Sequence, residues 1–423
     1  MLVFTLNGDD VMKLNTKTLK AACYMSNVTM SIVGNMSPLL FLTFRELYGI
    51  SYSLLGTLVL INFVTQLTID LIFSFFSHKF NIPLTVKLMP CIAMAGMLIF
   101  AATPWLFPTT IYLGLVIGTV IFSLGAGLAE VLISPTIAAL PSDDPDREMS
   151  KLHSIYAWGV VFFVVVFTVF IKLLGQKYWQ WMVIGFMAVP LFSAILFTQT
   201  KMPKMETPEK ASGALQQLKN KTLWLCFFAI FLGGASEVTM AQWASGYLEQ
   251  ALGIPKLWGD IFGVAMFAVT LGIGRTLYSK IGKNITKVLL LGAIGATLCY
   301  LTAAVSNIAI IGLLACAFTG FCTSMMWPGS LIVASDKFPH GGVFIFALMA
   351  AGGDFGASIG PQLVGIITDT VIEIPKAVEL SNMLNLSPEQ LGMKLGMICG
   401  MLFPLIGIII YSILHKQSKK SAQ

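Results

Sequence analysis

The chain has 423 residues, of which 56% are apolar and only 11% are charged, and its mean hydropathy is +0.83. A soluble domain carries roughly 25% charged residues, and even a large one keeps a polar outer layer. The composition therefore excludes a cytosolic enzyme, a nucleic-acid-binding protein and a disordered chain. It predicts an integral membrane protein.

Long apolar runs, interrupted by proline, glycine and charged residues, predict twelve membrane-spanning segments. These runs are too long and too continuous for the strands of a membrane barrel, which alternate in polarity over about ten residues. We expect helices, because a helix satisfies its own backbone hydrogen bonds in lipid. The predicted spans are 20–46, 52–77, 84–107, 109–140, 152–174, 179–199, 222–249, 258–280, 286–305, 308–335, 343–370 and 395–415.

The distribution of Lys and Arg predicts the orientation in the membrane. With the N-terminus inside, 20 of the 26 basic residues fall on the cytoplasmic side, in agreement with the positive-inside rule. This bias explains the net charge of +6 without a nucleic-acid partner. We expect a multi-pass protein of the cell membrane with both termini in the cytoplasm. The six basic residues on the outer side are Arg45, Lys172, Lys177, Lys256, Lys376 and Lys394.

The longest predicted cytoplasmic connection lies near the middle of the chain and separates six predicted helices from six. A weak repeat relates the halves, since Gly-Ile-Ser at 49–51 and Gly-Ile-Pro at 253–255 occupy corresponding positions. A six-plus-six repeat with a basic central loop is typical of a secondary transporter. The predicted organisation is an N-terminal bundle at 1–199, a cytoplasmic linker at 200–221 and a C-terminal bundle at 222–423.

Three segments carry recognisable motifs. Residues 125–141 (GAGLAEVLISPTIAALP) contain glycines, a Leu-x-Glu sequence and a proline five residues after the glutamate. Residues 233–248 contain Gly-Ala-x-Glu followed by a tryptophan, and residues 322–369 contain a proline, paired glycines and a closing aspartate. These segments resemble helices 4, 7 and 10–11 of the major facilitator superfamily, and within it the fucose-permease-like sugar:proton symporters. The resemblance implies an all-α membrane fold of two pseudo-symmetric six-helix bundles, and sugar transport coupled to protons.

The sequence departs from related patterns in the predicted first and fifth spans, among other places. Those symporters carry an acid in helix 1, whereas VGNMSPLL at 33–40 offers Asn35 and Ser37. The glycine-proline motif of drug:proton antiporters is absent from the predicted fifth span, which argues against multidrug efflux.

Four acidic residues, Asp70, Glu130, Glu237 and Asp354, lie inside predicted spans. A charged side chain at the centre of a membrane helix costs about 2.5–3.5 kcal/mol on insertion scales. We expect no Lys or Arg at comparable depth, because basic residues such as Arg275 fall near helix ends. The carboxyl groups should therefore be protonated, hydrated in a cavity or balanced by a bound cation.

Proton symport requires a carboxyl group that takes up a proton on one side of the membrane and releases it on the other. Glu130, Asp354 and Asp70 are the predicted proton-coupling residues. Glu130 is the first choice, because its depth and the resemblance, which implies a role in proton coupling and sugar binding, agree. The alternatives are an interhelical hydrogen bond for Glu130, helix packing for Asp354, and a salt bridge or inner gate for Asp70.

Sugars are bound by hydrogen bonds to their hydroxyl groups and by stacking on aromatic rings. Several polar and aromatic side chains in the spans fit this chemistry, although polar contacts between helices would also explain them. The predicted substrate-binding residues are Glu130, Glu237, Gln242, Trp243, Trp158, Tyr156, Asn35 and Trp327.

The sequence predicts a secondary active transporter that moves a small polar solute, a sugar, by proton symport with alternating access. No P-loop, catalytic triad or metal-ligand spacing occurs in it, so we expect no enzyme activity, cofactor or metal. The alternatives are import or export of another neutral or cationic metabolite, and sodium as coupling ion. The expected partners are the solute, protons and the lipid bilayer, and a monomer suffices.

Overall fold

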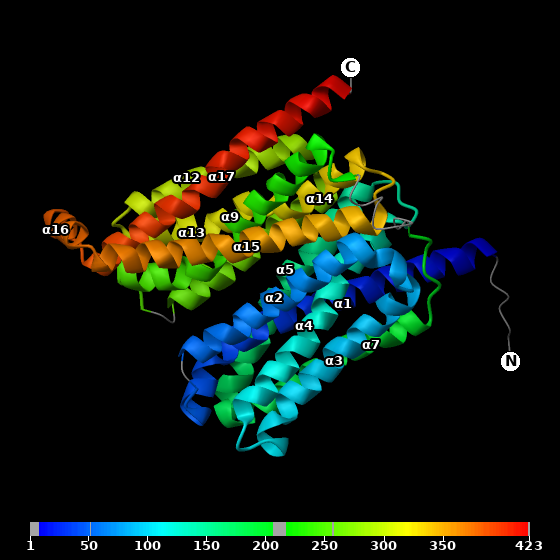
Figure 1. Cartoon of the computed structure of the whole chain (residues 1–423), viewed down its shortest axis with the longest axis horizontal. Helices are drawn as coiled ribbons and strands as arrows, with labels where there is room; N and C mark the ends of the chain where they lie inside the picture. The colour runs from blue at the N-terminus through cyan, green and yellow to red at the C-terminus, as the bar shows by residue number, and fades with distance from the viewer. Residues whose placement is uncertain (1–7, 51, 206–216, 256–257, 422–423) are drawn as a thin grey trace. The chain divides into compact units, whose positions relative to one another are not determined.

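The computed structural model describes residues 8–50, 52–205, 217–255 and 258–421, and these residues form helices without any β-strand (Figure 1). Parts of the sequence predictions fall outside these ranges. Residues 206–216 of the predicted linker and Lys256 of the predicted outer charges lie outside the described residues.

Helices in the first half of the chain begin at capping residues and at proline. Asn81 accepts a hydrogen bond from the Leu84 backbone N–H before α3, and Asp144 accepts one from the Arg147 N–H before α5. Gly175, with a φ of 91°, ends α5. The elements are α1 (Gly8–Tyr48), α2 (Tyr52–Phe76), η1 (Ser77–Lys79), α3 (Ile82–Leu106), α4 (Ile111–Ala138), α5 (Pro145–Leu174), η2 (Gln176–Tyr178), α6 (Trp179–Phe186) and α7 (Ala188–Thr198).

Similar signals bound the helices of the second half. Asn220 caps α9 through the Thr222 N–H, and Gly253, in the left-handed region with a φ of 66°, ends it. The elements are α9 (Lys221–Leu252), the π-helical η3 (Gly259–Ala265), α11 (Met266–Ile281), α12 (Ile285–Val305), α13 (Ala309–Thr323), α14 (Met326–Lys337), α15 (Gly342–Glu373), α16 (Pro375–Met383) and α17 (Pro388–Ser421).

Each of the twelve predicted spans lies almost entirely in helical residues, and two of them are divided between two α-helices. The span predicted at 308–335 lies in one segment long enough to cross a membrane, Ala309–Lys337, and that segment contains a turn at Ser324 and Met325 between α13 and α14. Pro328 explains the break, since proline has no N–H to donate to the carbonyl four residues earlier. The span predicted at 179–199 is likewise divided, into α6 and α7.

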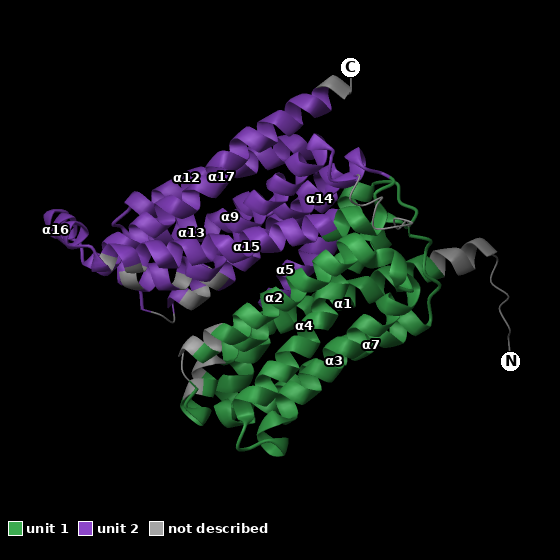
Figure 2. Cartoon of the chain, viewed as in Figure 1, with its two compact units in different colours: residues 1–148, 162–214, 340–347 green, residues 149–161, 215–339, 348–423 purple. Residues whose placement is uncertain are grey.

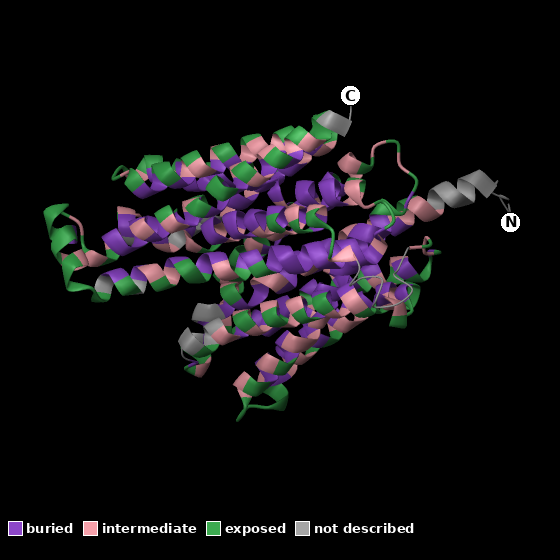
Figure 3. Cartoon of the chain, turned by 45° about the horizontal axis from the view of Figure 1, so that its top comes forward, coloured by how far each residue is buried: buried purple, intermediate pink, exposed green. Residues whose placement is uncertain are grey.

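Ten segments of the described residues are long and apolar enough to cross a membrane. The predicted spans 20–46 and 258–280 are helical but are not among these ten, so the finding is consistent with twelve spans. Large apolar side chains such as Leu60, Phe162 and Leu298 are exposed, and individual helices combine buried and exposed faces (Figure 3). Exposed apolar surface of this extent is typical of contact with lipid.

The chain divides into two compact units (Figure 2). Unit 1 contains residues 1–148, 162–214 and 340–347, and unit 2 contains residues 149–161, 215–339 and 348–423. The helices α5 and α15 therefore each contribute residues to both units.

In unit 1, α3 and α4 pack through small residues. A Cβ atom added to Gly96 would lie 2.1 Å from the Phe122 backbone nitrogen, and one on Gly125 would lie 2.6 Å from the Ala93 nitrogen. Such close backbone approach is typical of helix pairs in membranes. An aromatic cluster lies beside it, where the Phe44 and Trp179 ring centroids are 5.0 Å apart.

In unit 2, long side chains satisfy carbonyl groups of neighbouring helices. The Tyr300 hydroxyl on α12 donates to the Ser236 carbonyl on α9, and the Tyr411 hydroxyl on α17 donates to the Ala229 carbonyl, at 2.8 and 2.7 Å. The buried Lys394 ammonium donates to the Ala304 and Ser306 carbonyls at the C-terminal end of α12. A cation at that position is favoured by the helix dipole.

Candidate functional site

Unit 1 brings two membrane carboxyl groups together. Asp70 on α2 and Glu130 on α4 each present a carboxylate oxygen, and these two oxygens lie within 4.8 Å of each other. Asp70 is fully buried and Glu130 is half-buried. Both residues were predicted from the sequence as proton-coupling candidates, but their proximity was not.

The approach of α2 to α4 depends on small and polar residues. A Cβ atom on Gly127, one turn before Glu130, would lie 3.1 Å from the Gln66 Cα atom and 3.2 Å from the Ile69 Cβ atom. One turn before Gly127, the Ser123 hydroxyl donates to the Asn62 side-chain oxygen at 2.6 Å. Gly127 thus allows the close contact, and the Asn62–Ser123 hydrogen bond fixes the register that places the carboxyl groups side by side.

Two adjacent carboxyl groups behave as one titrating unit. Their mutual repulsion disfavours the doubly ionised state, so one proton between them, or a bound cation, lowers the electrostatic energy. Carboxylate oxygens are hard donors that could also take an alkali or alkaline-earth cation. The arrangement can therefore bind and release a positive charge inside unit 1.

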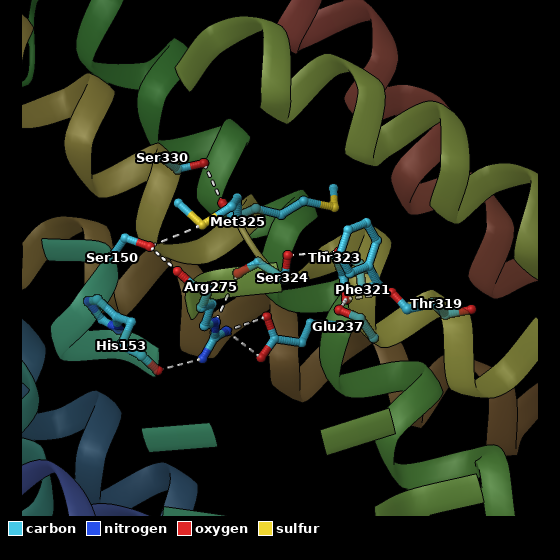
Figure 4. Close-up of polar contacts among 12 residues, drawn as sticks. Ser150, His153, Glu237, Arg275, Thr319, Phe321, Thr323, Ser324, Met325 and Ser330 are labelled. Atoms are coloured by element: carbon cyan, nitrogen blue, oxygen red, sulfur yellow. Dashed lines mark hydrogen bonds and ion pairs between the residues drawn. The ribbon is translucent and has the colours of Figure 1, made fainter. Parts of the chain in front are cut away.

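Unit 2 contains an ion pair between Glu237 on α9 and Arg275 on α11 (Figure 4). The Arg275 Nη2 atom lies 2.8 Å from both carboxylate oxygens, and both residues are buried. The prediction that no basic side chain lies near the membrane acids, with Arg275 close to a helix end, is wrong for Glu237. Arg275 precedes the end of α11 at Ile281 by six residues, and its long side chain lets the guanidinium reach α9.

The same guanidinium contacts two backbone carbonyl groups of unit 2. The Nε–H donates to the Ser324 carbonyl at 2.8 Å, and an Nη1–H donates to the His153 carbonyl at 3.2 Å. The backbone carbonyl of Arg275 in turn accepts from the Ser150 hydroxyl at 2.7 Å. Arg275 therefore joins α9, α11, the break between α13 and α14, and residues 149–161 of α5 (Figure 4).

The predicted aromatic ligands pack against helices of unit 2. The Trp243 indole N–H donates to the Pro361 carbonyl at 2.9 Å, and the Trp158 N–H donates to the Thr276 hydroxyl at 3.0 Å. The Trp327 ring lies against Gly353, where an added Cβ atom would be 2.3 Å from the Trp327 Cη2 atom. These contacts fix the rings, and their roles in solute binding stay predictions.

The remaining predicted site residues are distributed over both units. In unit 1 the Asn35 amide donates to the Ser31 carbonyl of its own helix at 2.8 Å. In unit 2 Tyr156 is half-buried on α5, Gln242 is exposed on α9, and Asp354 is buried on α15. Their predicted roles as solute or proton ligands stay predictions.

A comparison of the sequence with models of protein families shows the family of this chain. The sequence model described as the Major Facilitator Superfamily matches residues 22–361. The chain belongs to the major facilitator superfamily. It is therefore a multi-pass membrane transporter, as the sequence predicted. No curated protein matches the chain by sequence.

Solved structures of superfamily transporters share this fold at low sequence identity. FucP in the outward conformation superposes with a TM-score of 0.72 and 14% identity, covering 94% of this chain and 99% of its own. A structure of the E. coli fucose:proton symporter FucP gives a TM-score of 0.70 with the same identity and coverage. The proton:xylose symporter XylE, bound to 6-bromo-6-deoxy-D-glucose, gives 0.72 and 14% identity, covering 93% of this chain and 95% of its own.

Proposed function

We propose that this superfamily transporter moves a small neutral polar solute of the sugar class by proton symport. The observation that carries the proposal is the Asp70–Glu130 pair, whose carboxylate oxygens lie within 4.8 Å of each other. A pair that holds one proton in the membrane can bind it from one side and release it to the other as access alternates. The two bundles at 1–199 and 222–423, joined by the linker at 200–221, supply that alternation.

The chemistry of the second charged site supports an uncharged solute. Arg275 directs one N–H from Nε, one from Nη1 and the Nη2 group at protein oxygens. Because a guanidinium has five N–H donors, at most one is left for another ligand, and its charge is already balanced by Glu237. Arg275 therefore has little capacity left to bind an anionic solute.

The solved structures support the sugar class. FucP and XylE are described as symporters of protons with fucose and with xylose, and both share this fold. We propose the cell membrane as the location, with both termini in the cytoplasm as the positive-inside bias indicates, and a monomer as the working form.

Proton movement into proteoliposomes tests the proposal. Purified protein is reconstituted, and the internal pH is recorded on addition of fucose, xylose, glucose and other neutral sugars. We expect acidification with at least one sugar, and its loss in Glu130→Gln and in Asp70→Asn. Glu46→Gln, an exposed carboxyl at the end of α1 in the same unit, is the matched control and should retain the signal.

The possible outcomes test the coupling ion and the solute class separately. Sugar uptake that depends on sodium and causes no acidification would overturn proton coupling and indicate a cation at the carboxyl pair. Failure of both acidification and labelled-sugar exchange with every sugar would overturn the sugar class.

A further inference from the structure

The break between α13 and α14 lies inside a segment long enough to cross a membrane, Ala309–Lys337. Pro328 cannot donate to the carbonyl of Ser324, four residues earlier, and the helical bonding resumes with the Gly329 N–H to the Met325 carbonyl at 2.7 Å. A backbone carbonyl without a hydrogen-bond partner is strongly unfavourable at membrane depth. The Ser324 carbonyl therefore needs a donor from elsewhere in unit 2.

Arg275 supplies that donor. Its Nε–H lies 2.8 Å from the Ser324 carbonyl oxygen, and the Glu237 carboxylate balances the charge that the guanidinium brings. The contact requires α11 to lie directly against the break. Gly274 makes this possible, because an added Cβ atom there would be 2.2 Å from the Ser324 Oγ atom.

The same face of α9 contacts Trp327, in the first turn of α14. Gly234 and Glu237 are three residues apart and so lie on one face of the helix. An added Cβ atom on Gly234 would be 3.0 Å from the Trp327 Cζ3 atom, and Gly353 on α15 packs against the same ring. Two neighbouring turns of α9 therefore contact both the Trp327 ring, which follows the break, and Arg275, which binds the Ser324 carbonyl in the break.

We propose that Glu237 and Arg275 are positioning residues that fix the α13–α14 break and, through it, the orientation of the Trp327 ring. The proposal rests on the proposed function in one respect only, since Trp327 was predicted as a solute ligand. The neutral Glu237–Arg275–Ser324 arrangement stabilises the break in one geometry. Without it, the ring samples other orientations and solute binding weakens.

Fluorine NMR tests the orientation of the Trp327 ring without any solute. A negative result would therefore overturn the positioning role and leave the proposed transport function untouched. The protein is labelled with 5-fluorotryptophan, and the Trp327 resonance is assigned with Trp327→Phe. We expect Arg275→Gln and Glu237→Gln to shift or broaden this resonance and to leave that of Trp105, in α3 of unit 1, unchanged. Lys280→Gln, an exposed cation on α11, is the control.

Proline replacement separates this role from a general contribution to folding. Pro328→Ala restores an N–H that can reach the Ser324 carbonyl, so Arg275→Gln should perturb the Trp327 resonance much less in that background. The charge exchange Glu237→Arg with Arg275→Glu provides a second folded variant if the single change does not fold. A resonance that Arg275→Gln leaves unchanged in folded protein, or perturbs equally in both backgrounds, overturns the proposal.

A transport measurement extends the test once a solute is known. Arg275→Gln should raise the KM for the solute about tenfold with a smaller effect on kcat, and Arg275→Lys should recover part of the loss. An unchanged KM together with a reduced kcat would contradict a role through Trp327.

Discussion

Single and double replacements of Glu237 and Arg275 should affect the stability of the protein differently. Arg275→Gln leaves the Glu237 carboxylate buried without its cation, which costs about 3–5 kcal/mol for a buried pair. The double variant Glu237→Gln, Arg275→Gln buries no net charge and should be closer to wild type. Thermal unfolding in detergent measures this, and a double variant less stable than either single one would contradict the account.

The carboxyl pair predicts a second residue-level effect. Asp70→Asn leaves a carbonyl oxygen and an amide beside Glu130, so it removes the carboxylate repulsion that a shared proton would relieve. Solute exchange, which needs no net proton movement, should persist in this variant while uptake driven by a pH gradient fails. Loss of both activities at equal protein stability would indicate a solute-binding role for Asp70 instead.

The α3–α4 contact gives a prediction at the scale of elements. Gly96→Ala places a methyl group 2.1 Å from the Phe122 nitrogen, so the helices must separate. Overpacking of this kind costs about 1–3 kcal/mol. Gly185→Ala in α6 is the matched control, because an added Cβ atom there meets nothing within 4 Å. Equal unfolding temperatures for the two variants would contradict close α3–α4 packing.

The positions of the membrane spans were largely predictable, but several helices extend beyond them, as α1 (Gly8–Tyr48) does beyond 20–46 and α17 (Pro388–Ser421) does beyond 395–415. Apolar length alone located the helices, and capping residues such as Asn81 and Asp144 explain where α3 and α5 begin. The break at Ser324 was signalled by Pro328, but proline within a membrane helix is often tolerated. Apolar length therefore cannot distinguish a kinked span from an interrupted one.

The site was only partly predictable from the sequence. Depth and the Leu-x-Glu motif selected Glu130, but hydropathy carries no information on which helix faces which, so the approach of Asp70 was not foreseen. The sequence places Arg275 near a helix end, whereas the reach of its guanidinium depends on the length of its side chain and on Gly274. The small residues Gly127 and Gly274 were the available signals for both contacts.

The orientation of the whole molecule can be tested by labelling. The positive-inside bias predicts that the α3–α4 connection is extracellular and the α4–α5 connection is cytoplasmic. In a background without native cysteines, an impermeant thiol reagent added to whole cells should label Thr109→Cys and should not label Asp143→Cys. Both positions are exposed, and the reverse labelling pattern would contradict the predicted orientation.

Solute accumulation driven by an imposed pH gradient tests the central claim most directly. Proteoliposomes with wild-type protein, acidic outside, should concentrate a neutral sugar above its external level, and dissipating the gradient should release it. Vesicles with Glu130→Gln should only equilibrate the sugar. Wild-type vesicles that equilibrate the sugar at the same level with and without the gradient would contradict proton symport.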